Sequence, residues 1–329
     1  MSAPLAVGVL GTGTMASEVH LPALLATEGV QVAWVSDRDA ERARRIAKAH
    51  GVRAVDLTGD PLALPKADVV LLAIPYGARA PYYPVLAAMG AAVYVEKPFA
   101  RTLAEHDALA AAFAAERVAV GYQKRSAAFA RALRAVVAAG LFGELLTMRV
   151  EYGRPGVATG GRYSTNLALA GGGILFEVGV HSLDLALFVA DARSVGRVEG
   201  RMERELGFDV HTEATATLQT PRGRDVRLEI LVTNLWHTTG ELTLRFERAE
   251  VRVDPFGEGV VHVRPRDTNL DLELGGDAAA WPRTSGQMVS AHWAAFFGGI
   301  RAGTPNAASA AATRATTALV EGLYALGEK

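Results

Sequence analysis

The chain of 329 residues contains no cysteine, which excludes disulfide bonds, zinc–thiolate sites and catalysis by a thiol. It also lacks an excess of charge, because 34 Lys and Arg residues balance 35 Asp and Glu residues. Such a balance gives no electrostatic attraction to nucleic acid. A long apolar run is missing too, since no segment approaches the ~20 apolar residues of a membrane span. We therefore expect neither nucleic acid nor membrane as a partner.

The amino terminus has no basic region before its first apolar run, so we expect no signal peptide and a cytoplasmic location. Half of the residues are hydrophobic, as in a globular protein. The length is enough for two domains with sizeable cores.

A glycine-rich motif follows the first apolar run, at residues 5–10. The letters GTGTMA place Gly11, Gly13 and Ala16 in the spacing G-x-G-x-x-A, and a helical pattern comes next. Between a strand and a helix this spacing is typical of dinucleotide binding, because the glycines allow a tight turn and a close approach to the pyrophosphate. The residues of this turn expected to contact the cofactor are Gly11, Gly13, Thr14 and Met15.

An acidic residue ends the second strand-like run, QVAWVSDR. Asp37 lies where a carboxylate can bind the ribose hydroxyls of NAD and repel the extra phosphate of NADP. Arg38 could instead attract that phosphate, so NADP stays open. A purely structural alternative is that Asp37 caps the next helix.

The alternation continues to about residue 122 and predicts six strands with intervening helices, a doubly wound parallel sheet. Ligands of such sheets lie at the carboxyl ends of the strands. The residues at these ends include Ile74, Pro75, Tyr76, Glu96, Lys97, Tyr122 and Gln123. We assign Tyr122 to the substrate, Lys97 to the chemistry, and the others to the cofactor.

The letters GGGILFEVGVHSLD, at residues 171–184, contain a second candidate site. In a helix, Glu177, His181 and Asp184 share one face, and a carboxylate one turn before a histidine can orient it as a proton carrier. The structural alternative is a solvated surface pair.

The second half of the chain is rich in strand patterns separated by turns, which predicts a mostly antiparallel sheet with one open face. This face is a plausible dimerisation surface, and packing by the chain's own helices is the alternative. In the loop 154–166, Arg162 and Tyr163 could line a substrate pocket or lie on the surface. The histidines and carboxylates form no convincing metal site.

Glu96-Lys97-Pro98 completes a set of motifs by which the chain resembles the Gfo/Idh/MocA oxidoreductase family. The others are VGVLGTGTMA, IPY, GYQKR and GGGILFEVGVHSLD. The resemblance implies a Rossmann domain at 1–122 and an α/β domain at 123–329 that binds substrate and forms a homodimer or homotetramer. It also implies an active-site role for Lys97, a cis bond before Pro98, and a catalytic role for His181.

The chain departs from the family pattern at two positions. Glu177 stands where the family usually has Asp, and Arg79 stands where many relatives have a histidine. The longer Glu177 could still support His181 or change the shape of the pocket. The cofactor contacts near Arg79 are open.

The resulting expectation is an NAD(P)-dependent enzyme that transfers a hydride between nicotinamide and a polyhydroxylated substrate: a sugar, cyclitol or nucleotide sugar. Lys97 and His181 would form the proton-transfer pair, with Asp184 among the substrate contacts or as a structural residue. The alternatives are an NADPH-dependent keto-sugar or imine reductase and a non-catalytic nicotinamide sensor.

Overall fold

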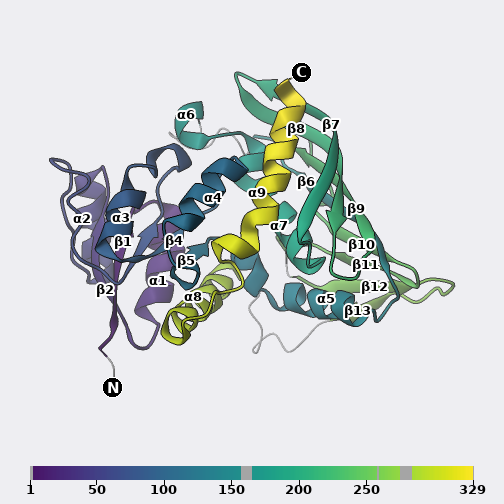
Figure 1. Cartoon of the computed structure of the whole chain (residues 1–329), viewed down its shortest axis with the longest axis horizontal. Helices are drawn as coiled ribbons and strands as arrows, with labels where there is room; N and C mark the ends of the chain where they lie inside the picture. Colours follow the sequence, from purple (N-terminus) through teal and green to yellow (C-terminus); the bar gives the residue numbers. More distant parts are fainter. Residues whose placement is uncertain (1–2, 157–164, 258, 275–283, 329) are drawn as a thin grey trace. The chain divides into compact units, whose positions relative to one another are not determined.

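The computed structural model describes residues 3–156, 165–257, 259–274 and 284–328, which form two compact units (Figure 1). Unit 1 consists of Met1–Phe99, Ala104–Gln123 and Thr284–Ala312. Unit 2 consists of Ala100–Leu103, Lys124–Arg283 and Thr313–Lys329. The segment 284–312, expected in a second domain at 123–329, therefore belongs to unit 1.

Unit 1 is built on a five-stranded parallel sheet in the order β2-β1-β3-β4-β5. Its strands are β1 (Leu5–Leu10), β2 (Val30–Ser36), β3 (Val69–Leu72), β4 (Ala92–Val95) and β5 (Val118–Val120). Six strands were predicted, which is one too many. The stretch 51–68 contains Pro61 and Pro65 and contributes only the isolated bridge between Val35 and Ala54.

The helices of unit 1 connect and cover these strands (Figure 1). They are η1 (Met15–His20), α1 (Leu21–Leu25), α2 (Ala40–His50), η2 (Tyr76–Ala78), α3 (Tyr82–Met89), α4 (Leu103–Ala111), η3 (Ala115–Arg117) and α8 (Ser285–Ala302). Helix α8 places Trp293, Phe296 and Phe297 in one core with Val7 and Leu24. The dinucleotide unit is thus completed by a late segment of the chain.

Unit 2 is built on an eight-stranded sheet in the order β13-β12-β11-β10-β6-β9-β8-β7. Its strands are β6 (Leu145–Gly153), β7 (Ser194–Glu205), β8 (Phe208–Gln219), β9 (Asp225–Thr233), β10 (Leu242–Phe246), β11 (Ala249–Val253), β12 (Val261–Pro265) and β13 (Leu272–Leu274). Among the described strands of this sheet only the β6–β9 pair is parallel, so the predicted mostly antiparallel sheet is confirmed.

The longer helices of unit 2 lie on one face of this sheet (Figure 1). The helical segments are η4 (Gln123–Ser126), α5 (Ala128–Ala139), α6 (Leu167–Ala170), η6 (Leu175–Gly179), α7 (Val180–Val189), α9 (Ala310–Ala325) and η7 (Leu326–Glu328). Contrary to the sequence prediction, Leu167–Val189 is long and apolar enough to pass for a membrane span. Its most apolar window is 83% buried inside the protein, as in the core helix of a globular domain.

Candidate functional site

The glycine turn after β1 has the geometry that a dinucleotide needs. Gly11 has a φ of +95°, and a Cβ atom there would collide with the carbonyl of Ala73, so only glycine fits. A Cβ at Gly13 would meet nothing within 4 Å. Thr14 and Met15 follow as exposed residues at the start of η1, while Ala16 is buried against the core. The turn therefore fits a pyrophosphate group, with open space beside its second glycine.

Asp37, at the end of β2, is hydrogen-bonded to this turn through Thr12. Its carboxylate accepts hydrogen bonds from the Thr12 N–H (2.7 Å) and hydroxyl (3.0 Å), and from the Arg42 guanidinium (2.6 Å). Burial alone would raise the pKa of Asp37, but these donors outweigh it, so the pKa is lowered. The side chain of Asp39, not Asp37, caps α2 by accepting from the Arg42 N–H at 3.0 Å, because Asp39 directly precedes the first turn.

The turn after β4 carries Lys97, and the Lys97–Pro98 bond is cis, as expected. The buried Glu96 carboxylate lies 2.8 Å from His20 Nε2 and accepts from the Lys97 N–H at 3.2 Å. Since Trp293 Nε1 can only donate, its 3.0 Å bond to His20 Nδ1 makes Nε2 the proton-bearing nitrogen. The carboxylate of Glu96 thus lies within a structural network of unit 1.

The charge of Glu96 is stabilised by this network. Burial would raise its pKa, but the hydrogen bond from His20 and the positive charges of Lys97 and Arg79 outweigh burial and lower it. An ionised carboxylate therefore accompanies Lys97 at the end of β4.

The other strand-end residues of unit 1 have diverse surroundings. Ile74 and Pro75 are half-buried, and the Tyr76 hydroxyl donates to Glu105 at 2.5 Å. Tyr122 and Gln123 are buried after β5. The side-chain oxygen of Gln123 has no hydrogen-bond partner within the described ranges, so it can accept from a ligand amide.

In unit 2 the glycines 171–173 form a tightly held turn. Asp209 accepts from the N–H groups of Gly173 (2.5 Å) and Leu175 (2.6 Å), and also from the Tyr324 hydroxyl. Arg101 donates to the Gly171 carbonyl at 2.7 Å. A Cβ at Gly173 would collide with the Asp209 backbone, which explains the glycine.

Glu177 and His181 follow this turn, with Glu177 in the π-helical segment η6 and His181 in the first turn of α7. The sequence predicted an ordinary α-helix. Such π-turns are rare and recur at functional sites. Glu177 is half-buried and His181 is 9% exposed.

Asp184 is held in a buried ion pair with Arg125. Its carboxylate accepts from Arg125 Nη2 (2.6 Å) and Nε (2.8 Å) and from the Thr316 hydroxyl (2.8 Å). All of these groups are buried, so the pair anchors α7 inside unit 2.

Sequence reasoning missed several residues at these sites. Arg42 contacts Asp37 from the first turn of α2, and Asp209 holds the glycine turn from β8. Tyr152, on β6, has a pKa raised by burial and by the nearby charge of Glu177. Asp209 and Tyr152 act across the fold and have no sequence signal of their own, whereas Arg42 lies only five residues after Asp37. Arg162 and Tyr163 lie outside the described residues.

No group of three or more His, Asp or Glu residues in the described ranges is arranged to hold a metal ion.

Comparison with known proteins agrees with this geometry. Residues 5–123 match an oxidoreductase family with an NAD-binding Rossmann fold, and residues 130–252 match the GFO/IDH/MocA C-terminal domain. D-glucoside 3-dehydrogenase of Escherichia coli is 30% identical over 63% of this chain and 60% of its own length. Inositol 2-dehydrogenase of Pseudomonas fluorescens is 30% identical over 69% of this chain and 68% of its own length.

The aligned part of the chain spans about 60 to 68% of the length of these two relatives. Similarity to solved structures covers nearly the whole chain. An oxidoreductase domain protein from Kribbella flavida has a TM-score of 0.84 at 20% identity, over 99% of this chain and 98% of its own. By both matched domains and by the fold, this chain belongs to the Gfo/Idh/MocA family of oxidoreductases.

Proposed function

We propose that the protein transfers a hydride between a nicotinamide dinucleotide and a secondary alcohol or ketone of a sugar, cyclitol or nucleotide sugar. The observation that carries this proposal lies in unit 1. The open glycine turn follows β1 and Lys97 follows β4, so both lie at the carboxyl edge of one parallel sheet. This edge is where open α/β sheets bind their ligands. The named activities of the relatives give the substrate class.

The bound nicotinamide supplies the hydride acceptor, or the donor in the reverse direction. The imidazole of His181 takes the proton of the substrate hydroxyl as the carbonyl forms, and Glu177 orients that imidazole. The ammonium group of Lys97 stabilises the negative charge that develops on the substrate oxygen. In the reverse direction the same two groups return a proton to the ketone.

The chain connection supports the assignment of Lys97 and His181 to one reaction. Arg101 follows Lys97 by only four residues, and its guanidinium binds the Gly171 carbonyl in the turn that leads to His181. Four residues of chain and one hydrogen bond thus connect the Lys97 turn to the glycine turn, which precedes His181 by ten residues.

A screen of cyclitols, sugars and nucleotide sugars, followed by NADH absorbance, tests this function. Lys97→Ala should lower turnover by at least ~10²-fold, as for a lost acid–base group, while NADH binding persists. Near-normal turnover would remove Lys97 from the chemistry. Tight NADH binding with no turnover on the whole panel would favour the sensor instead.

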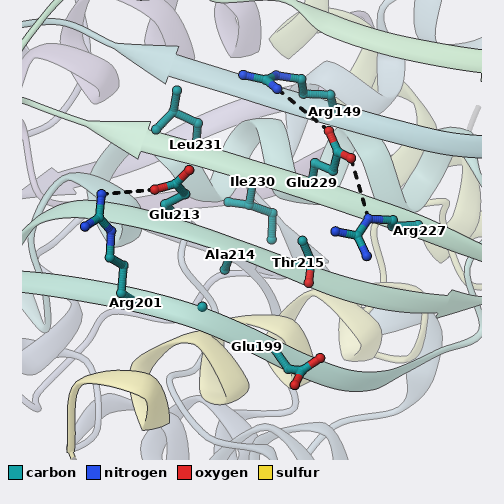
Figure 2. A pocket seen from close by; sticks show the side chains of 11 residues that line it. Arg149, Glu199, Arg201, Glu213, Ala214, Thr215, Arg227, Glu229, Ile230 and Leu231 are labelled. Carbon is teal, nitrogen blue, oxygen red and sulfur yellow. Dashed lines mark hydrogen bonds and ion pairs between the residues drawn. The ribbon is translucent and has the colours of Figure 1, made fainter.

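We also propose that the open face of the eight-stranded sheet binds a second copy of this chain. This face has an open pocket of about 600 Å³. Figure 2 shows the charged side chains of both signs that line it. Glu229 lies between Arg149 (3.7 Å) and Arg227 (3.5 Å), and Arg201 binds Glu213 at 3.1 Å. Because the face carries charges of both signs, a second copy related by a two-fold axis can place its arginines against the glutamates of the first.

The oligomeric state tests this face. Glu229→Arg would place three cations together and should shift the mass measured by light scattering toward the monomer. Glu41→Arg reverses an exposed charge on α2 and should leave the mass unchanged. A monomeric wild-type protein, or a Glu229→Arg variant that keeps the wild-type mass, would contradict the proposal.

A further inference from the structure

Arg79 is a buried cation with an unusual set of partners. It lies between η2 and α3 and is only 3% exposed. Its Nη1 donates to the carbonyls of Glu96 (2.5 Å) and Pro98 (2.6 Å), and its Nε donates to Ile74 (3.0 Å). Nη2 lies 3.4 Å from the carbonyl of Lys97. One guanidinium therefore contacts all three carbonyls of the turn 96–98.

Burying the charge of Arg79 costs desolvation free energy, which an apolar side chain of the same size would not. Burial lowers the pKa of Arg79, because desolvation disfavours its charge. The hydrogen-bond acceptors of its guanidinium are neutral backbone carbonyls, while the nearby negative charge of Glu96 only partly offsets the desolvation. The benefit of the guanidinium is geometric, because its donors form a rigid planar fork that fixes several acceptors at once.

The Glu96 side chain holds the same turn through a second contact. The Glu96 carboxylate accepts from the Lys97 N–H and is itself fixed by His20. Donors of Arg79 and an acceptor of Glu96 thus fix the backbone from which the Lys97 side chain extends. The end of β3, at Ile74, is joined to the end of β4 by the same guanidinium.

We propose that Arg79 is a positioning residue for Lys97: its guanidinium holds the backbone of 96–98 so that the Lys97 amine reaches a fixed place. The inference rests on the proposed catalytic role of Lys97. It assigns a role to one of the two departures from the family pattern.

The test is Arg79→Lys, which keeps a positive charge but loses the planar set of guanidinium donors. A small misplacement of a catalytic group can lower the reaction rate by up to ~10²-fold. We therefore expect kcat to fall by roughly 10-fold to 10²-fold, with KM and the NADH Kd nearly unchanged. In a Lys97→Ala background the same substitution should have almost no further effect on kcat, since both act through one amine. Equal losses in the two backgrounds would overturn the inference.

Two control variants separate positioning from general damage. Arg117→Lys alters an arginine of unit 1 that donates to the Gly90 carbonyl, at the opposite end of β4 from the 96–98 turn, and should keep kcat. Leu24→Ala removes a buried core side chain and should lower the melting temperature without a comparable loss of kcat.

A second readout does not depend on turnover. The rate at which acetic anhydride acetylates Lys97, followed by mass spectrometry, should differ between Arg79→Lys and wild type, while exposed Lys66 reacts equally in both. If no substrate is turned over, the proposed function fails but this readout still decides the inference. An unchanged Lys97 rate would then overturn it.

Discussion

Lys124 offers a quantitative prediction, because it is a lysine buried in unit 2. Its side chain is 8% exposed, its Nζ donates to the Pro255 carbonyl at 2.5 Å, and it lies 4.0 Å from the centre of the Phe256 ring. Burial lowers its pKa from 10.5 to about 8, although the charge of Asp254 opposes the shift. The folded protein therefore releases this proton at lower pH than the unfolded chain does.

The sign of the stability change follows from this difference. Between pH 8 and 10.5 the unfolded chain binds more protons than the folded protein, so the free energy of unfolding rises with pH in that window. At about 1.4 kcal/mol for each pKa unit, the full rise amounts to about 3 kcal/mol. Lys124→Met cannot ionise, and it should therefore lack this rise.

Urea unfolding followed by circular dichroism, repeated from pH 7 to 10.5, measures the difference between wild type and Lys124→Met. The variant should be relatively most stable at pH 7 and should lose that advantage as the pH rises. Lys66→Met replaces an exposed lysine and serves as the control, with a difference from wild type that stays constant. A constant difference for Lys124→Met as well would refute the reasoning.

Three further outcomes are expected. Arg42→Ala removes the cation that binds Asp37, the carboxylate expected to bind the ribose, and should shift the ratio of NADH to NADPH affinity toward NADH by about tenfold, or ~1.4 kcal/mol, in a fluorescence titration. Gly173→Ala drives a methyl group into the Asp209 backbone and should destabilise the protein by about 1–3 kcal/mol in thermal melts, whereas Gly286→Ala, in open space on α8, should not. Asp184→Asn leaves a buried arginine without its counter-charge and should cost about 3–5 kcal/mol in urea unfolding; a loss below 1 kcal/mol would contradict the buried pair.

Local patterns in the sequence were good guides to local geometry. The glycine turn at 11–13 appears as predicted, because it depends on residues adjacent in the chain and their spacing is enough to specify it. The cis bond before Pro98 appears as the family resemblance implied.

Features that depend on distant residues were not predictable in the same way. The π-turn at Glu177 has the same apolar periodicity as an α-helix, and Asp209 stabilises it from another element. The role of Asp39 as the cap of α2 differs from the considered alternative by only two positions. Arg79 was visible only as a departure from a pattern, because its acceptors in the 96–98 turn lie 17 to 19 residues further along the chain.

The membership of α8 in unit 1 has a consequence for synthesis of the protein. A ribosome releases residues 284–312 only after nearly all of unit 2 has emerged. Unit 1 therefore cannot complete its core until α8 has been synthesised. Until then, Leu24 and Val7 lack the aromatic partners Trp293 and Phe296. A truncation before residue 284 should therefore leave both halves incomplete, and a recombinant fragment of the first 123 residues should need the α8 segment supplied to fold stably.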